Sequence, residues 1–130
     1  MKVLLCMVYL HLIDDYVLQG WLASAKCKSW WEHNCPNEKY KNDYIIALIE
    51  HAFMNSFFIH IPIYLWLCQN EFCLILTLLF MTAVHAKVDH LKANKKKINL
   101  WQDQLIHIIT VLWLWATYYF IFLYMELRVK

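Results

Sequence analysis

The sequence predicts an all-α protein built as a four-helix transmembrane bundle. Apolar residues make up 62% of the chain and the mean hydropathy is +0.39, whereas soluble domains are nearer one half apolar. One glycine and two prolines are too few turn residues for a β-sandwich or barrel. Four apolar segments each exceed the roughly 20 residues that cross about 30 Å of hydrocarbon. The length of 130 residues indicates a single domain, residues 1–130.

The first segment begins as a secretory signal peptide would. A lysine, an apolar run and the small residues 23–25 follow that pattern. However, His11, Asp14 and Asp15 interrupt the apolar run, and a signal core would not carry them. We therefore expect a first transmembrane helix over residues 2–25.

A polar segment follows this helix. Residues 26–42 include Pro36, so we expect them to form a loop. Trp30 and Trp31 in this segment suit the level of the lipid headgroups. The loop would therefore lie at one membrane surface.

The second expected helix covers residues 43–68. Asn42 or Asp43 can cap its start. Pro62 lies inside it and predicts a kink, or the end of one part of the helix, because proline lacks the amide hydrogen.

Two more helices complete the predicted bundle. A tight connection at 69–71 leads to a third helix over residues 72–93, and a basic loop at 94–98 leads to a fourth over 99–127. The stretch 108–125 is apolar apart from two threonines. The four helices would then run alternately up and down through the membrane.

Basic residues predict the orientation of this bundle. With four spans, the two long connections lie on one side and both termini on the other. The connection side carries Lys26, Lys28, Lys39, Lys41, Lys92, Lys95, Lys96 and Lys97, and the terminal side carries Lys2, Arg128 and Lys130. By the positive-inside rule, the connections are cytoplasmic and both termini are non-cytoplasmic.

Histidine and aspartate recur at helical spacing in these apolar segments. On a helix, His11, Asp15 and Gln19 project from one face, about 6 Å apart along the axis. The same four-residue spacing of a histidine and an aspartate returns in His85/Asp89 and, in reverse order, in Asp103/His107. The reversed order is what an antiparallel helix needs to bring its aspartate to the same depth as the others.

Depth brings these groups together in one half of the bundle. At 1.5 Å per residue, Asp15, His51, His85 and His107 lie about 10–16 Å from the basic loops. A charge at bilayer depth costs at least about 2.5–3.5 kcal/mol, so such groups should face one another or a water-filled cavity. These groups can either line a functional cavity or form hydrogen bonds that hold the helices together.

Imidazoles and carboxylates that converge inside a bundle are good ligands for a divalent transition metal. We therefore predict a zinc, iron or manganese site in the cytoplasmic half. Its candidate ligands are His11, Asp15, His51, His85, Asp89, Asp103 and His107. Around these ligands we expect supporting or substrate-facing groups from Gln19, Asn55, Gln104 and Lys92.

Other polar groups receive structural interpretations. His60, near Pro62, is expected to form a structural hydrogen bond. Cys27, His33 and Cys35 could hold zinc but lack a C-x-x-C core. The five cysteines have no framework spacing, so we expect reduced or buried thiols.

The ordered set of motifs resembles a known family. It consists of His11-x-x-x-Asp15-x-x-x-Gln19, His51, His85-x-x-x-Asp89-x-x-Lys92 and Asp103-Gln104-x-x-His107. The chain is similar over nearly its whole length to small integral-membrane proteins of bacteria and their phages, catalogued as domain of unknown function 3307. The resemblance implies a multi-pass protein of the bacterial inner membrane. The family also has a looser resemblance to membrane proteins described as metal-dependent hydrolases, which suggests a hydrolase activity. The lysine- and asparagine-rich loops and the scarce glycine are compatible with a phage gene.

Three functions fit these observations. In the first, a metal-dependent hydrolase cleaves a lipid-borne or membrane-proximal substrate, with Asp15 or Asp89 as general base and Lys92 or Lys87 neutralising an anionic substrate. In the second, a non-catalytic phage or bacterial protein binds a host membrane component through its loops, for example as a defence inhibitor. The third is a proton or metal-ion conduit, but the outer half of the bundle offers little beyond His60 to continue a path for the ion. A net charge of +2 gives no indication of nucleic acid.

Overall fold

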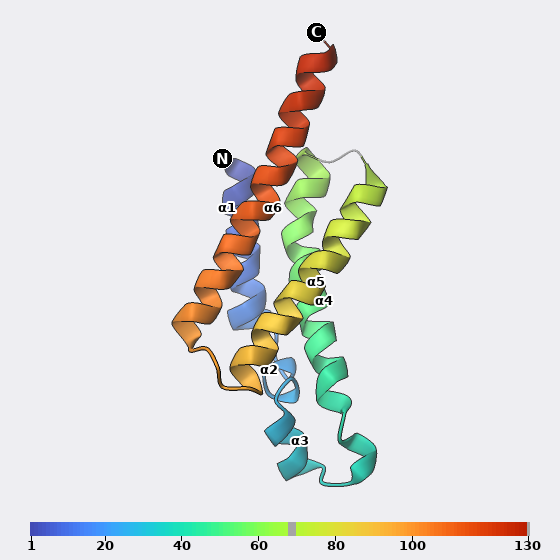
Figure 1. The fold of residues 1–130 in the computed structure, drawn as a ribbon, viewed down its shortest axis with the longest axis vertical. Helices are drawn as coiled ribbons and strands as arrows, with labels where there is room; N and C mark the ends of the chain where they lie inside the picture. The colour runs from blue at the N-terminus through green and yellow to red at the C-terminus, as the bar shows by residue number, and fades with distance from the viewer. Residues whose placement is uncertain (68–69, 130) are drawn as a thin grey trace.

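The computed structural model describes residues 1–67 and 70–129, and these residues contain helices and no strand. The predicted all-α class is therefore confirmed. The elements, coloured along the chain in Figure 1, are α1 (Lys2–Ile13), the π-helix η1 (Asp14–Leu18), α2 (Leu22–Ala25), α3 (Lys28–Asn34), the 3₁₀-helix η2 (Glu38–Tyr40), α4 (Asp43–Trp66), α5 (Glu71–Ala93) and α6 (Leu100–Val129).

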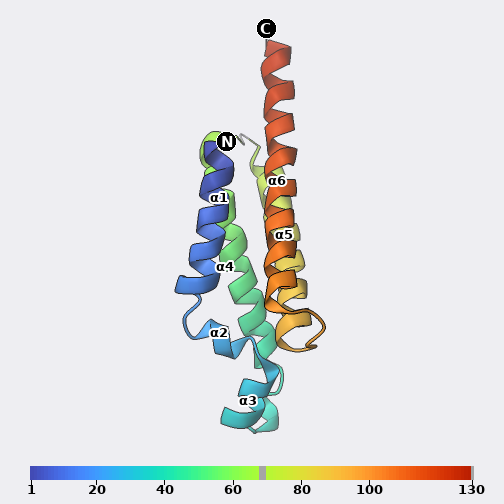
Figure 2. The ribbon, with the colours of Figure 1, turned by 90° about the vertical axis from the view of Figure 1, so that its left-hand side faces the viewer.

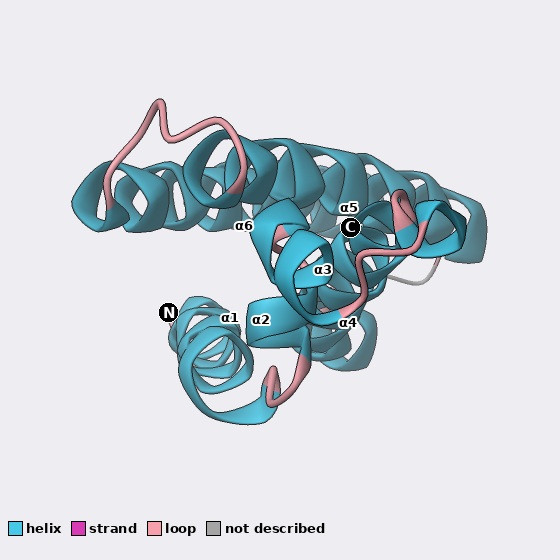
Figure 3. Ribbon diagram, turned by 90° about the horizontal axis from the view of Figure 1, so that it is seen from below, coloured by secondary structure: helices cyan, strands magenta, loops and turns pink. Residues whose placement is uncertain are grey.

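Four of these helices lie side by side. α1 packs against α4 and α6, and α5 packs against α4 and α6, an arrangement visible end-on in Figure 3. Both termini lie at one end, whereas α3 and the connection between α5 and α6 lie at the other (Figure 1). We call this second end the loop end. That the loop end faces the cytoplasm stays a prediction.

Three segments are long and apolar enough to cross a membrane: Glu38–Trp66, Glu71–Ala93 and Leu100–Arg128. Their outward faces carry large apolar side chains, such as Phe72 and Phe120, each 68% exposed. α6 also extends past the other helices at the terminal end (Figure 2). An apolar exterior around polar interior groups is the distribution that hydrocarbon favours.

The first helix differs from the continuous helix expected over residues 2–25. α1 ends at Ile13 and passes into the π-helix, where the Gln19 amide donates to the Asp14 carbonyl five residues earlier, at 3.0 Å. Gly20 then adopts φ +47°, a left-handed conformation that glycine tolerates and that commonly ends helices. The chain turns here before the short α2.

The remaining boundaries follow the sequence more closely. The expected loop 26–42 contains α3 and η2. α4 begins at Asp43, without a side-chain cap from Asn42, and continues through the buried Pro62 to Trp66. The predicted helix end at residue 68 and part of the connection 69–71 fall outside the described residues.

The interior divides into two zones along the bundle. The zone near the termini is an apolar core of Met7, Ile59, Ile63, Met81, Val111, Leu114 and Tyr118. On α1, Met7 lies in this core and His11 lies nearer the loop end. On α4, Ile59 lies in the core and His51 lies nearer the loop end. Both histidines are only 1% exposed. Buried histidines and aspartates therefore fill the half nearer the loops, as the depth argument predicted.

The turn at Gly20 can be tested by substitution. A Cβ at this position would meet only the Leu18 carbonyl oxygen, at 3.8 Å, so Gly20→Ala should add backbone strain without a clash. We expect it to lower the free energy of unfolding by about 1 kcal/mol, measured by denaturation in detergent micelles. Gly20→Asn should cost less, because asparagine tolerates this conformation better. Equal effects of the two variants would contradict the explanation.

Candidate metal site

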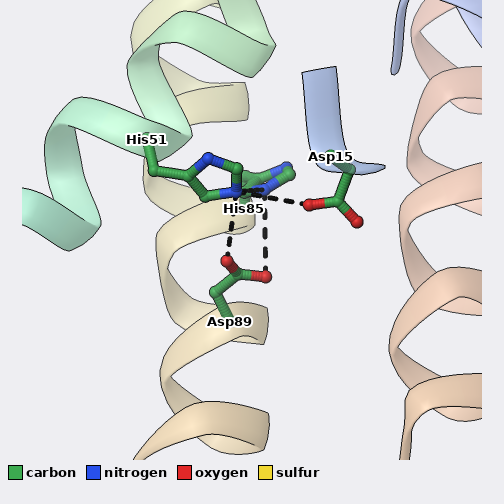
Figure 4. Close-up of side chains that lie close together, drawn as sticks. All are labelled: Asp15, His51, His85 and Asp89. Carbon is green, nitrogen blue, oxygen red and sulfur yellow. Dashed lines mark hydrogen bonds and ion pairs between the residues drawn. The ribbon is translucent and has the colours of Figure 1, made fainter. Parts of the chain in front are cut away.

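Four buried side chains from three parts of the chain converge in the polar zone. They are Asp15 from η1, His51 from α4, and His85 and Asp89 from α5, and one ligand atom from each lies within 4.8 Å of the others. His51 Nε2 is 3.3 Å from Asp15 Oδ1 and 3.3 Å from Asp89 Oδ2. Figure 4 shows these groups pointing toward one another. We call Asp15, His51, His85 and Asp89 the first ligand group.

Local backbone geometry explains why these side chains meet. His85 and Asp89 are four residues apart on α5 and so share one helix face. On the first segment, the wider π-turn carries both Asp14 and Asp15 into the interior, where they are 3% and 5% exposed. The side-chain amide of Gln19 donates to the Asp15 carbonyl. π-turns of this kind are rare and are found frequently at functional sites.

A second group includes α6. Asp89, Asp103 and His107 also offer ligand atoms within 4.8 Å of one another. His107 Nε2 is 3.3 Å from Asp89 Oδ1 and 3.5 Å from Asp103 Oδ1. We call these three residues the second ligand group. Asp89 belongs to both groups.

Two lysines supply positive charge beside the carboxylates. Lys26 Nζ lies 2.6 Å from Asp89 Oδ2, and Lys92 Nζ lies 2.6 Å from Asp103 Oδ2. The Lys26 side chain is 9% exposed, whereas that of Lys92 is 30% exposed. Buried charges need such partners, since an unpaired one is strongly destabilising.

Gln104 links the two groups, as expected of a supporting residue. Its side-chain amide donates to Asp15 Oδ2 at 2.6 Å and to Asp103 Oδ2 at 3.2 Å. The carboxylates of η1 and α6 are thereby held close together. Fixed carboxylate orientation is what outer-shell hydrogen bonds provide in metal sites.

His11 lies beside both ligand groups rather than within them. Asn55 Nδ2 donates to Asp14 Oδ2 at 3.0 Å, which leaves Asn55 Oδ1 facing His11 Nδ1 at 3.1 Å. Because that oxygen only accepts, this contact requires a proton on His11 Nδ1. The ring centroid of His11 is 5.3 Å from that of His107. A metal-ligand role for His11 stays a prediction.

A small cavity adjoins these groups. Its polar lining includes His11, Asn55, Ser56, His85 and His107, and its volume is about 10 Å³, close to the space that one water needs. His11 Nε2 and Ser56 Oγ are buried and have no hydrogen-bond partner in the described part of the chain. Both atoms are therefore available to a small polar ligand.

Sequence reasoning overlooked part of this site. It used Lys26 only as a marker of orientation, because one lysine in a polar loop carries no sign of burial. It treated Asp14 as an interruption of the apolar run and not as a candidate ligand, whereas the structure buries Asp14 next to Asp15. Ser56 could have been noticed, because it follows His51 by five residues on the same apolar helix.

Other polar residues have the structural roles expected of them. His60 Nδ1 lies 2.7 Å from the Ser56 carbonyl and Nε2 lies 3.2 Å from Thr77 Oγ1, as a structural histidine should. Among the described residues, Cys27, His33 and Cys35 do not form a metal-binding group. Cys6, Cys27, Cys35 and Cys73 are free, in agreement with reduced thiols; Cys68 lies outside the described residues.

No protein-family model, curated protein or solved structure matches the chain. The resemblance to the small integral-membrane family therefore stays a prediction.

The pairing of Lys26 with Asp89 predicts a coupled response to substitution. Asp89→Asn leaves a buried ammonium without its carboxylate and should lower the free energy of unfolding by about 3–5 kcal/mol, measured in detergent with a chelator present. Adding Lys26→Met should restore part of that loss. The exposed pair Lys28–Glu32, 3.5 Å apart, is the control, and Glu32→Gln should have little effect. Strictly additive effects at positions 26 and 89 would contradict the pairing.

Proposed function

We propose that this chain is a membrane-embedded, metal-dependent hydrolase whose site lies in the loop-end half of the bundle. The observation that carries the proposal is the first ligand group, in which two imidazoles and two carboxylates meet in a buried space. Two histidines with two carboxylates suit zinc, iron or manganese.

The facing histidine nitrogens fit a cation. His51 Nε2 and His85 Nε2 are 3.3 Å apart. Both side chains are buried. Two neutral imidazoles can share one hydrogen there, whereas a metal ion would engage both lone pairs and the adjacent carboxylates together. The donor set therefore matches a divalent ion.

The proposed reaction is the hydrolysis of a phosphoester, amide or related bond. A bound ion would supply the positive charge that activates water and polarises the substrate. The water oxygen bonds to the phosphorus or carbonyl carbon, the bond to the leaving group breaks, and the water proton passes through the protein to the leaving group. Asp15 and Asp89 are the candidate general bases, and His11 Nε2 is a further acceptor beside the cavity.

Substrate would approach from the loop end. Lys92 is the partly exposed cation of the site, and Lys95, Lys96 and Lys97 are exposed nearby on the connection to α6. Clustered lysines at a membrane surface attract anionic headgroups. We therefore propose a lipid-borne or membrane-proximal substrate and, with the family resemblance, a place in the bacterial inner membrane.

A non-catalytic membrane interaction protein is the second candidate. The observation favouring it is that Lys26 and Lys92 already form short ion pairs with Asp89 and Asp103, as polar groups holding a bundle together would. In that case the lysines and tryptophans of the loop end would contact a host membrane partner. Loop substitutions would then abolish the biological effect, whereas His85→Gln would not.

Metal content tests the proposed enzyme directly. Protein purified in detergent without chelators should retain zinc, iron or manganese, measured by mass spectrometry. His85→Gln and Asp15→Asn should lose most of this metal, because each removes a ligand of the first ligand group. His33→Gln, which lies on exposed α3, is the matched control and should retain it.

The hydrolysis rate should depend on the metal content of the protein. In vesicles of bacterial lipids, release of a water-soluble product should fall at least about 100-fold in His85→Gln and after chelation, and should return when the ion is restored to wild-type protein. The proposal would be refuted if wild-type protein bound no transition metal, or if folded His85→Gln kept the wild-type hydrolysis rate.

A further inference from the structure

We propose that the polar zone holds two divalent metal ions rather than one, with Asp89 bridging them. The inference rests on the proposed function and adds a second ion in the second ligand group, where α6 supplies Asp103 and His107. Two-metal sites stabilise both the attacking and the leaving oxygen of a displacement.

The orientation of the Asp89 carboxylate supports a bridging role. Its Oδ2 lies 3.3 Å from His51 Nε2, on the α4 side. Its Oδ1 lies 3.3 Å from His107 Nε2, on the α6 side, and 3.8 Å from His85 Nε2. The two oxygens of one carboxylate thus face imidazoles of different helices, as in a bridging carboxylate. Because Oδ2 also accepts from Lys26 Nζ at 2.6 Å, the first ion would share that oxygen with the ammonium.

A buried carboxylate oxygen without a hydrogen bond supports a second ion at Asp103. Asp103 is fully buried, and its Oδ1 has no hydrogen-bond partner among the described residues. That atom lies 3.5 Å from His107 Nε2, beyond the ordinary length of a hydrogen bond. A buried carboxylate oxygen that lacks a hydrogen bond is costly. A cation between Asp103 Oδ1, His107 Nε2 and Asp89 Oδ1 would satisfy all three atoms.

Charge decides how a second ion can be accommodated. Asp14, Asp15, Asp89 and Asp103 are buried, and Lys26 and Lys92 offset two of their four charges, so one divalent ion balances the remainder. A second ion adds two positive charges, so it needs the withdrawal of one lysine together with one further negative charge. Lys92 can withdraw, because its side chain is 30% exposed and its only carboxylate contact among the described residues is Asp103 Oδ2, at 2.6 Å. The second ion would therefore compete with the Lys92 ammonium for Asp103.

This competition also gives Lys92 a second use. Once displaced from Asp103, its ammonium would remain at the mouth of the site, where an anionic substrate arrives. Lys26 cannot exchange in this way, because it is 9% exposed and held against Asp89. The two lysines therefore have different roles despite their similar ion pairs.

Manganese is a suitable probe, because it accepts carboxylate and imidazole ligands and its electron paramagnetic resonance spectrum distinguishes isolated from paired ions. Chelator-treated full-length protein in detergent, titrated with Mn²⁺, should bind two ions per chain, and the second should produce a spin-coupled spectrum. Asp103→Asn should bind one ion, with the spectrum of an isolated ion. Asp43→Asn, at the start of α4 and outside both ligand groups, is the matched control and should bind two.

Lys92→Met gives an independent measurement. Removing the competing ammonium should tighten the binding of the second Mn²⁺ at least several-fold and leave the first little changed. The inference is overturned if wild-type protein binds one Mn²⁺ without spin coupling, and this decides the matter even if a variant fails to fold. In that outcome the proposed mononuclear hydrolase stands, whereas binding of no metal at all would refute both.

Discussion

The structure depends on the neutralisation of Asp89 inside an apolar-coated bundle. Its carboxylate lies within 4 Å of imidazoles from α4, α5 and α6, and 2.6 Å from the ammonium of Lys26, which follows α2. An isolated buried carboxylate would be too costly for a protein of this size to retain. The segments that supply these partners are therefore held close together around this one residue.

Two backbone features make that convergence geometrically accessible. The π-turn of η1 directs Asp14 and Asp15 inward together, and Gly20 then turns the chain into α2, so that Lys26 can return to the interior. Asn94 secures this return, since its side-chain amide donates to the Lys26 carbonyl at 3.0 Å and its oxygen accepts from the Lys28 amide at 2.7 Å. The end of α5 thereby fixes the segment that supplies the counter-charge for Asp89.

Periodicity in the sequence was sufficient to predict the helices and much of the site, and local backbone departures account for what it missed. The four-residue spacing of His85/Asp89 and Asp103/His107 correctly places the members of each pair on one helix face, because α5 and α6 are regular helices. The same reasoning fails for residues 14–25, where a π-turn and a left-handed glycine replace the continuous helix. Burial of Lys26 depends on a contact with Asp89, 63 residues away, and no local pattern encodes such a contact.

The unpaired atoms argue for a ligand site over a purely structural network. A network selected only to hold helices together gains most when every buried polar atom is paired. Here His11 Nε2, Ser56 Oγ and Asp103 Oδ1 are buried without hydrogen-bond partners in the described residues. The first two line a cavity next to His85 and His107, and the third adjoins the carboxylate shared by both ligand groups. These atoms are therefore the ones that the proposed metal ion and its water would contact.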